Sequence, residues 1–259
     1  MFLPAARRFQ LAALLGSALL LGSLAPVAAQ APNGLGALYP RPRYPGGPNS
    51  LRAALQRLAR VPGAPAAGEL FIQLQLDEAG HLRDLMPLTA PRSPQAVRLT
   101  KAQARALDAA LAKWPTWQLA SPQPEASPPT ITLPVSFGPT ASSTALPYAD
   151  VPPVFSASSL GLNASQPAGG LELVTFLQRQ VRYPADDLRM QRQGDAYGYF
   201  EVSETGVIEQ RRIVGSLSPT IDAEVLRVLQ LLPDAQAPAR SQGRPVRIFC
   251  LVPIRLRIQ

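Results

Sequence analysis

The sequence predicts an α+β protein of two tandem two-layer units, each with a three-stranded antiparallel sheet and two helices on one face. Several segments alternate apolar and polar residues, which is typical of half-buried strands, and others carry apolar residues at helical spacing. The order of these segments occurs twice along the 259 residues. Two layers are the natural way to bury one face of a sheet against apolar helix stripes.

The first half begins with a predicted helix that ends before Pro62 and has three leucines on one face: Leu51, Leu55 and Leu58. Residues 68–77 then alternate as a strand does. Residues 77–80 form a turn signal, in which Gly80 can take the left-handed conformation that closes a hairpin. Residues 81–88 are the returning strand.

A second helix of this half is expected to begin at Thr100. Gln103 stands three residues later, which is the spacing of a capping box. The apolar stripe of this helix is formed by Ala104, Leu107, Leu111 and Trp114, and Pro115 is expected to end it. A short alternating strand follows at 131–137.

The second half follows the same plan. A polar helical turn is expected at 185–193, and strands at 195–203 and 207–214 flank a turn at Gly206. The next helix is capped by Ser218 and has a proline at its first position. Its buried face is formed by Ile221, Val225, Val228 and Leu232.

Direct matches between the halves support an internal repeat. At a shift of 122 positions, eight of the eighteen residues in 45–62 recur. At a shift of 126, Gly68, Glu78 and Gly80 meet Gly194, Glu204 and Gly206. Because the order is kept through five elements, chance similarity of amphipathic segments is rejected. We therefore predict units at 38–138 and 166–259, joined by a linker at 139–165 whose reach as a random coil is roughly 30 Å.

The last stretch, 245–259, reads as a strand with one apolar face, and Pro253 within it places part of that strand at a sheet edge or bulge. An unpaired strand edge is a docking surface for another chain. Arg247, Arg255 and Arg257 lie between the apolar positions. We read them as a solvated strand face, with a site for an acidic partner as the alternative.

The N-terminus predicts a secretory signal peptide at 1–29. Arg7 and Arg8 precede an apolar run at 11–24, and small residues follow Pro26. The alternative is an uncleaved inner-membrane anchor, but the run is short for a span. The expected location of the mature chain is the periplasm.

Composition argues against several function classes. The net charge of +8 is spread among acidic residues without a basic block, so no nucleic-acid partner is expected. The single cysteine, Cys250, is predicted to be a buried and inert thiol, and the single histidine, His81, lies far from it. No metal site, cofactor or catalytic residue is predicted.

The motifs of the second half, in their order, resemble the TonB C-terminal domain. They are Tyr183-Pro184, the Gly-started hairpin at 194–214, Asp222-Ala223, Gly243-Arg244-Pro245-Val246 and the final strand. In the first half, Pro45-Gly46-Gly47 is similar to the entry of some of these domains. Trp117-Gln118-Leu119-Ala120 is similar to the family's Trp-x-Pro-Ala element, with Leu119 in place of the proline.

The resemblance implies a two-layer α+β fold in the periplasm of a Gram-negative cell. The family typically grips the TonB box, a short extended segment of an outer-membrane TonB-dependent receptor, by adding it as a strand to its sheet. It implies partner-binding residues at Tyr183 and Pro184 and along the last strand, at Val246, Arg247, Ile248, Phe249, Cys250, Leu251 and Val252. A half-buried anchor for a helix start is the other reading of Tyr183.

We therefore predict a non-enzymatic periplasmic module that docks extended receptor segments in envelope transport. The apolar N-terminal run lacks the histidine of a classical energy transducer, and the linker is too short to span the periplasm, so the chain is not expected to harvest proton-motive force itself. The alternative is a structural envelope protein that self-associates through its sheet edges, for example as a homodimer. An enzyme is the least supported reading.

Overall fold

A computed structural model describes residues 42–88, 97–119, 129–138, 144–161 and 170–258, and the predicted signal peptide lies outside these ranges. Among the described residues, no helix combines the length and apolar character needed to cross a bilayer.

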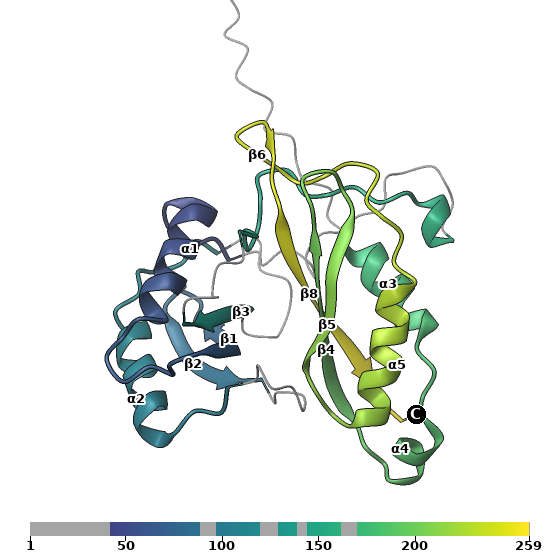
Figure 1. Ribbon diagram of the computed structural model, residues 1–259, viewed down its shortest axis with the longest axis horizontal. Helices are drawn as coiled ribbons and strands as arrows, with labels where there is room; N and C mark the ends of the chain where they lie inside the picture. The colour runs from purple at the N-terminus through teal and green to yellow at the C-terminus, as the bar shows by residue number, and fades with distance from the viewer. Residues whose placement is uncertain (1–41, 89–96, 120–128, 139–143, 162–169, 259) are drawn as a thin grey trace, which may run out of the picture. The chain divides into compact units, whose positions relative to one another are not determined.

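The first half has five elements in the predicted order. They are α1 (Gly47–Leu58), β1 (Gly68–Leu76), β2 (Leu82–Pro87), α2 (Lys101–Leu111) and β3 (Thr130–Phe137). The strands form an antiparallel three-stranded sheet in the order β2-β1-β3 (Figure 1). The capping box at Thr100 and Gln103 is confirmed. The predicted extent of this helix is wrong, because it ends at Leu111, and Trp114 lies after it, where its N–H donates to the Leu111 carbonyl.

The second half has the elements α3 (Gly170–Gln180), α4 (Ala185–Arg189), β4 (Gly194–Val202), β5 (Ile208–Gly215), α5 (Pro219–Gln230) and β8 (Ile248–Leu256). Its sheet is antiparallel with the order β5-β4-β8. Two short strands, β6 (Arg240–Ser241) and β7 (Arg244–Pro245), form a separate hairpin before β8. The Ser218 cap is confirmed, since its side chain accepts from the Ile221 amide.

Two helices cover one face of this second sheet. Helix α5 packs on β4 and β5, while α3 packs on β8 and against α5 (Figure 1). The layer between them is formed by fully buried side chains, among them Leu173, Leu177, Phe200, Val225 and Val252. The alternation read in the sequence therefore marks the helix-facing side of the strands.

The hairpin turns of the two halves are built alike. In the first, Asp77 accepts from the amides of Ala79 and His81; in the second, Ser203 Oγ accepts from those of Thr205 and Val207. Each turn closes on a glycine with positive φ, Gly80 or Gly206. The carbonyl of each glycine then accepts from the chain after the following helix, from Trp117 or Ala235, at 2.8 Å in both. The halves thus share their order of elements, their central strand and their turn chemistry.

The region predicted as a linker is packed where the structure describes it. Residues 144–161 include a 3-10 turn, η1 (Ser158–Leu160), and contain buried side chains at Leu146, Tyr148, Phe155 and Leu160. Val154 pairs with Ala237 through two backbone hydrogen bonds of 2.9 and 3.2 Å. The random-coil expectation is wrong here, because apolar side chains among the prolines supply surface to bury.

Side chains from the helix-free faces of the two sheets contact one another. Gln73 of β1 donates to the Tyr197 hydroxyl at 3.2 Å, and the rings of Phe71 and Tyr199 lie edge to face at 5.7 Å. Arg212 of β5 binds both carboxylate oxygens of Glu69, at 2.9 and 3.0 Å. These residues occupy alternate strand positions opposite the helix-facing ones.

Candidate strand-docking edge

Strand β8 is an edge strand, as Pro253 predicted. It pairs with β4 in an unbroken antiparallel register from Leu256 opposite Gly194 to Ile248 opposite Val202. The predicted docking residues Val246 and Arg247 precede this strand, and the Val246 amide donates to Ala239 at 2.9 Å. The paired edge is therefore shorter at its start than the sequence pattern indicated.

The outer edge of β8 is bonded at its two ends. At the start, the Leu146 amide donates to the Arg247 carbonyl at 2.8 Å and the Phe249 amide donates to the Leu146 carbonyl at 3.1 Å. At the far end, the Gln178 side-chain amide of α3 donates to the Arg255 carbonyl at 2.7 Å and accepts from the Arg255 amide at 3.0 Å. Gln178 thus makes the two bonds that a neighbouring strand residue would make.

A window remains between these two contacts. Since the backbone groups of Arg247, Phe249 and Arg255 point outward, strand alternation turns those of Leu251 and Pro253 outward as well. Within the described part of the chain, no partner bonds to the Phe249 carbonyl, to either backbone group of Leu251, or to the Pro253 carbonyl. Pro253 has no N–H, so its place at an outward position leaves no donor unsatisfied. We call these four unbonded outward groups, the Phe249 carbonyl, both backbone groups of Leu251 and the Pro253 carbonyl, the edge window.

The opposite edge of the sheet, β5, is less regular. Gln210 has a φ of 54°, and the register with β4 shifts between Tyr199 and Glu201. The Arg211 side chain donates back to carbonyls of its own half, those of Ile208, Leu229 and Leu232. A bulge of this kind discourages the addition of a further strand, so β8 is the better docking edge.

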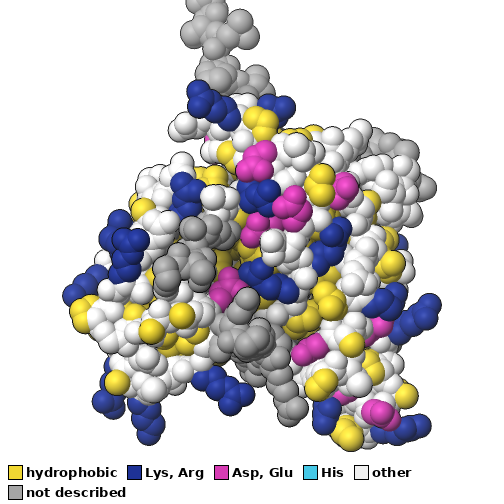
Figure 2. All heavy atoms as spheres, viewed as in Figure 1, with side chains coloured by type: hydrophobic (Ala, Val, Ile, Leu, Met, Phe, Trp, Pro, Cys, Tyr) yellow, Lys and Arg dark blue, Asp and Glu magenta, His cyan; other side chains and the backbone are white. Residues whose placement is uncertain are grey.

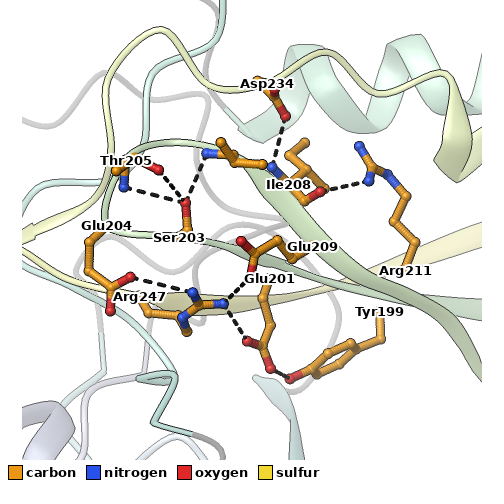
Figure 3. Close-up of polar contacts among 11 residues, drawn as sticks. Tyr199, Glu201, Ser203, Glu204, Thr205, Ile208, Glu209, Arg211, Asp234 and Arg247 are labelled. Atoms are coloured by element: carbon orange, nitrogen blue, oxygen red, sulfur yellow. Dashed lines mark hydrogen bonds and ion pairs between the residues drawn. The ribbon is translucent and has the colours of Figure 1, made fainter.

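Arg247 lies among three carboxylates and not on a solvated strand face. Figure 3 shows its guanidinium between Glu201, Glu204 and Glu209. The Glu201 and Glu204 oxygens lie at 3.3 and 3.5 Å from it, and its side chain is only 22% exposed. The hydrogen bonds that Arg247 donates, first of all to Glu209, raise its pKa above the usual value. The prediction for Arg247 is therefore wrong, because β4 and β5 bring acidic side chains to it that are distant in sequence.

The other two arginines of this stretch are more exposed and share one carboxylate. Arg257 lies 3.1 Å from Asp195, and Arg255 lies 3.8 Å from the same oxygen. Over the face seen in Figure 2, basic and acidic side chains are interspersed. The geometry gives no concentrated basic site for an acidic partner at these residues.

Tyr183 and Pro184 lie near the opposite end of β8 from Val246. The Tyr183 hydroxyl donates to the Arg192 carbonyl, two residues before β4 begins opposite Leu256. Pro184 is the N-cap residue of α4, and Tyr183 is partly buried against the core. The predicted site residues are thus distributed along the strand and not gathered at one point.

One comparison with known proteins bears on this region. Residues 179–258 match the family model of the Gram-negative bacterial TonB protein C-terminal. The match begins at the end of α3 and includes all three strands of the sheet, β4, β5 and β8, together with helices α4 and α5. Comparisons with curated proteins and with solved structures gave no significant match.

The TonB C-terminal match supports several coarse predictions. This family is a non-enzymatic, transport-associated domain of the Gram-negative envelope, and it implies interaction with envelope proteins such as outer-membrane receptors. The first half lies outside the matched residues, so its TonB-like character stays a prediction.

Three of the predicted residues in the TonB-matched strand have defined surroundings. Cys250 and Val252 are buried toward the helices, and burial raises the pKa of the Cys250 thiol, which disfavours the reactive thiolate. Phe249 points to the other face, where it stacks on Tyr199 at 6.0 Å. No group of three or more potential metal-ligating side chains occurs among the described residues.

Sequence reasoning missed the two residues that bound the edge window. The internal repeat drew attention to Gln178, because it matches Gln56 at the shift of 122 positions. No sequence pattern, however, indicates that its side chain bonds to the backbone of Arg255. Leu146 lies in the segment read as a linker, and nothing in its neighbourhood indicated a contact with residues about one hundred positions later.

Proposed function

We propose that the protein is a periplasmic protein-binding module of envelope transport, and that it docks an extended segment of an outer-membrane TonB-dependent receptor on the edge of β8. The observation that carries this proposal is the edge window, a run of outward backbone groups on a regular strand inside the TonB-matched residues. A strand added there would complete a fourth position of the sheet.

The window offers a limited but directional set of bonds. From Phe249 to Pro253 it spans roughly 13 Å at the rise of a β-strand. It presents one donor and three acceptors, and each hydrogen bond contributes about 0.5–1.5 kcal/mol net. Backbone bonds alone therefore support weak, sequence-tolerant binding, and selectivity must come from side chains.

A small cavity beside Phe249 is suited to such selectivity. It has a volume of about 50 Å³ and is lined by residues that include Pro134, Ser136, Pro147 and Phe249. A cavity of this size fits a small apolar side chain better than an aromatic or charged one. Because Ala145 and Pro147 also line this cavity, we propose that a docked segment that leaves Leu146 in place puts a small residue there.

Other parts of the proposal rest on sequence and on the resemblance. Residues 1–29 act as the secretory signal, and the first half is a second, reduced TonB-like unit whose element order matches that of the second. Tyr183 and Pro184 contact the receptor beyond the end of β8. The protein is not itself a harvester of proton-motive force.

Replacement of Leu251 by proline tests the docking edge. Leu251→Pro removes the only outward amide of the window without touching a bond to β4, and Pro253 shows that the strand accepts proline at an outward position. We expect the fold to persist and the affinity for synthetic N-terminal segments of TonB-dependent receptors to fall about two- to tenfold, which corresponds to the loss of about 0.5–1.4 kcal/mol. Isothermal titration and circular dichroism measure the two effects.

The matched control is Val252→Pro, which removes an amide that faces β4 and is expected to unfold the sheet. Unchanged peptide affinity in folded Leu251→Pro would contradict docking at this edge. A protein that binds only itself, with self-association lost in the same variant, would favour the self-associating envelope protein instead.

A further inference from the structure

The first position on the outer edge of β8 is occupied by the chain itself. Leu146 lies parallel to Ile248 and makes two backbone bonds, to Arg247 and from Phe249. A visiting strand would use the same two groups of β8 at that position. We propose that residues 144–147, the occupant segment, are displaceable, and that a partner segment longer than the edge window binds by replacing Leu146. This inference rests on the proposed function.

The described pairing of the occupant segment with β8 is the single bridge of Leu146 to Ile248. Pro147 follows Leu146 and has no N–H with which to continue a ladder. By contrast, β4 pairs with β8 over nine positions on the other side. A partner that extends from the window toward Arg247 would replace the two hydrogen bonds of Leu146 and add those of the window. Because the Leu146 side chain is buried, the partner must also bring an apolar side chain to that position.

On its other side, the occupant segment and Tyr148 after it contact the first half, and the side chains of residues 145–148 are buried. Arg52 donates to the Thr144 carbonyl at 3.3 Å, and the Tyr148 hydroxyl donates to the Tyr44 carbonyl at 3.4 Å. The Arg43 guanidinium lies 4.5 Å from the centre of the Tyr148 ring. Displacement of Leu146 would strain or break these contacts, so partner docking would also be sensed by residues near α1.

The segment beyond the occupant is anchored more firmly. Val151 and Arg240 exchange two backbone bonds of 2.9 and 2.8 Å, and the Asp150 carboxylate accepts from the Gln242 amide at 2.7 Å. These contacts would keep the released segment beside β8, where it could return once the partner leaves. The boundary between the displaceable occupant segment and the anchored segment therefore lies between Pro147 and Asp150.

Amide hydrogen exchange on the full-length protein tests displacement without any ligand. The Phe249 amide points to Leu146, whereas the adjacent Cys250 amide points to β4. If the occupant opens locally, Phe249 should exchange at least 100-fold faster than Cys250, while the Arg240 amide on the anchored part exchanges slowly. Equal protection of Phe249 and Cys250 would overturn the proposal.

A reversible lock tests the link to binding. In a Leu146→Cys, Ile248→Cys, Cys250→Ala variant, a disulfide between the two paired positions would hold the occupant in place. The reduced form of the same molecule is the control, and its circular dichroism establishes that it folds. The probe is a set of synthetic N-terminal segments of TonB-dependent receptors.

We expect the oxidised form to bind at least tenfold more weakly than the reduced form. Equal binding in both forms would overturn displacement while supporting docking at the window. Absence of binding in both forms would instead contradict the proposed function, and the amide exchange of Phe249 would then decide alone whether the occupant is displaceable.

Discussion

At the scale of single residues, the turn glycine of the second hairpin is tied to the chain on both sides. Gly206 has a φ of 91°, its amide donates to the Ser203 carbonyl, and its carbonyl accepts from Ala235. A Cβ at this position would lie 2.6 Å from the Ala235 carbonyl oxygen. Glycine is therefore required here for its backbone conformation and for its lack of volume.

We predict that Gly206→Ala destabilises the protein more than a glycine substitution in open space. Gly243, with a φ of 76° and no atom within 4 Å of its would-be Cβ, is the matched control. Gly243→Ala should lower the free energy of unfolding by about 1–2 kcal/mol, which is the cost of placing an alanine in the left-handed backbone conformation. In urea unfolding, Gly206→Ala should lower the free energy of unfolding by more than Gly243→Ala does. Equal losses of stability in the two variants would mean that the backbone at Ala235 shifts to accommodate the added Cβ at little cost.

A buried carboxylate gives a second residue-scale prediction. Burial raises the pKa of Asp222, although the Ser216 hydroxyl and the Leu217 amide donate to it, and the nearby Asp187 adds to the rise. The folded state therefore keeps this proton to a higher pH than the unfolded state does. As the pH rises from the unfolded pKa through the folded one, this carboxylate progressively lowers the free energy of unfolding.

Asp222→Asn should remove this pH-dependent fall in the free energy of unfolding, because asparagine does not ionise. The free energy of unfolding of the variant, relative to wild type, should increase as the pH rises above the unfolded pKa of about 4, as measured by urea unfolding at each pH. Asp108→Asn in α2 makes the same charge change on an exposed side chain and serves as the control. A pH-independent difference for Asp222→Asn would show that burial does not act on this group as described.

At the scale of elements, caps decide where two of the helices begin. Thr100 accepts from the Gln103 amide, and the Gln103 side chain accepts from the Thr100 amide at 3.0 Å. We predict that Thr100→Ala costs about 0.5–2 kcal/mol in thermal or urea unfolding. Ser50→Ala, on an exposed turn of α1 without a cap role, is the control. A negligible loss would mean that packing of Leu107 and Leu111 alone fixes the start of α2.

At the scale of the whole molecule, one ion pair links the two sheets. Arg212 binds both oxygens of Glu69, and its guanidinium lies 3.8 Å from the centre of the Tyr199 ring. Burial raises the pKa of Glu69, while Arg212 opposes this rise. The pair is partly shielded from water, which makes its loss more costly than that of an exposed pair.

A double-mutant cycle of Glu69→Gln and Arg212→Met should therefore give a coupling energy of about 0.5–3 kcal/mol in urea unfolding. The exposed pair of Arg189 and Asp186 in α4, at 2.9 Å, provides the control cycle, and its coupling should be smaller. Coupling of equal size in both cycles would argue that the link between the sheets contributes little.

Sequence patterns determined the local elements of this protein for a simple physical reason. Alternation, helical spacing, the Thr100 and Ser218 caps and the turn glycines all act within a few residues, so they indicate strands, helices and hairpins directly. Pro253 identified the edge strand because a missing amide is tolerated only where no neighbour needs it. The same reasoning placed Cys250 correctly on the buried face.

Only the tertiary structure decided which parts of that edge are open. Arg247 appeared solvated because the carboxylates around it come from β4, β5 and the turn between them. Leu146 reaches β8 from a segment about one hundred positions away from the residues it bonds, and Gln178 reaches it from 77 positions away. Such contacts depend on the three-dimensional placement of separate elements, which local periodicity does not encode. The edge window between them is therefore a property of the folded chain.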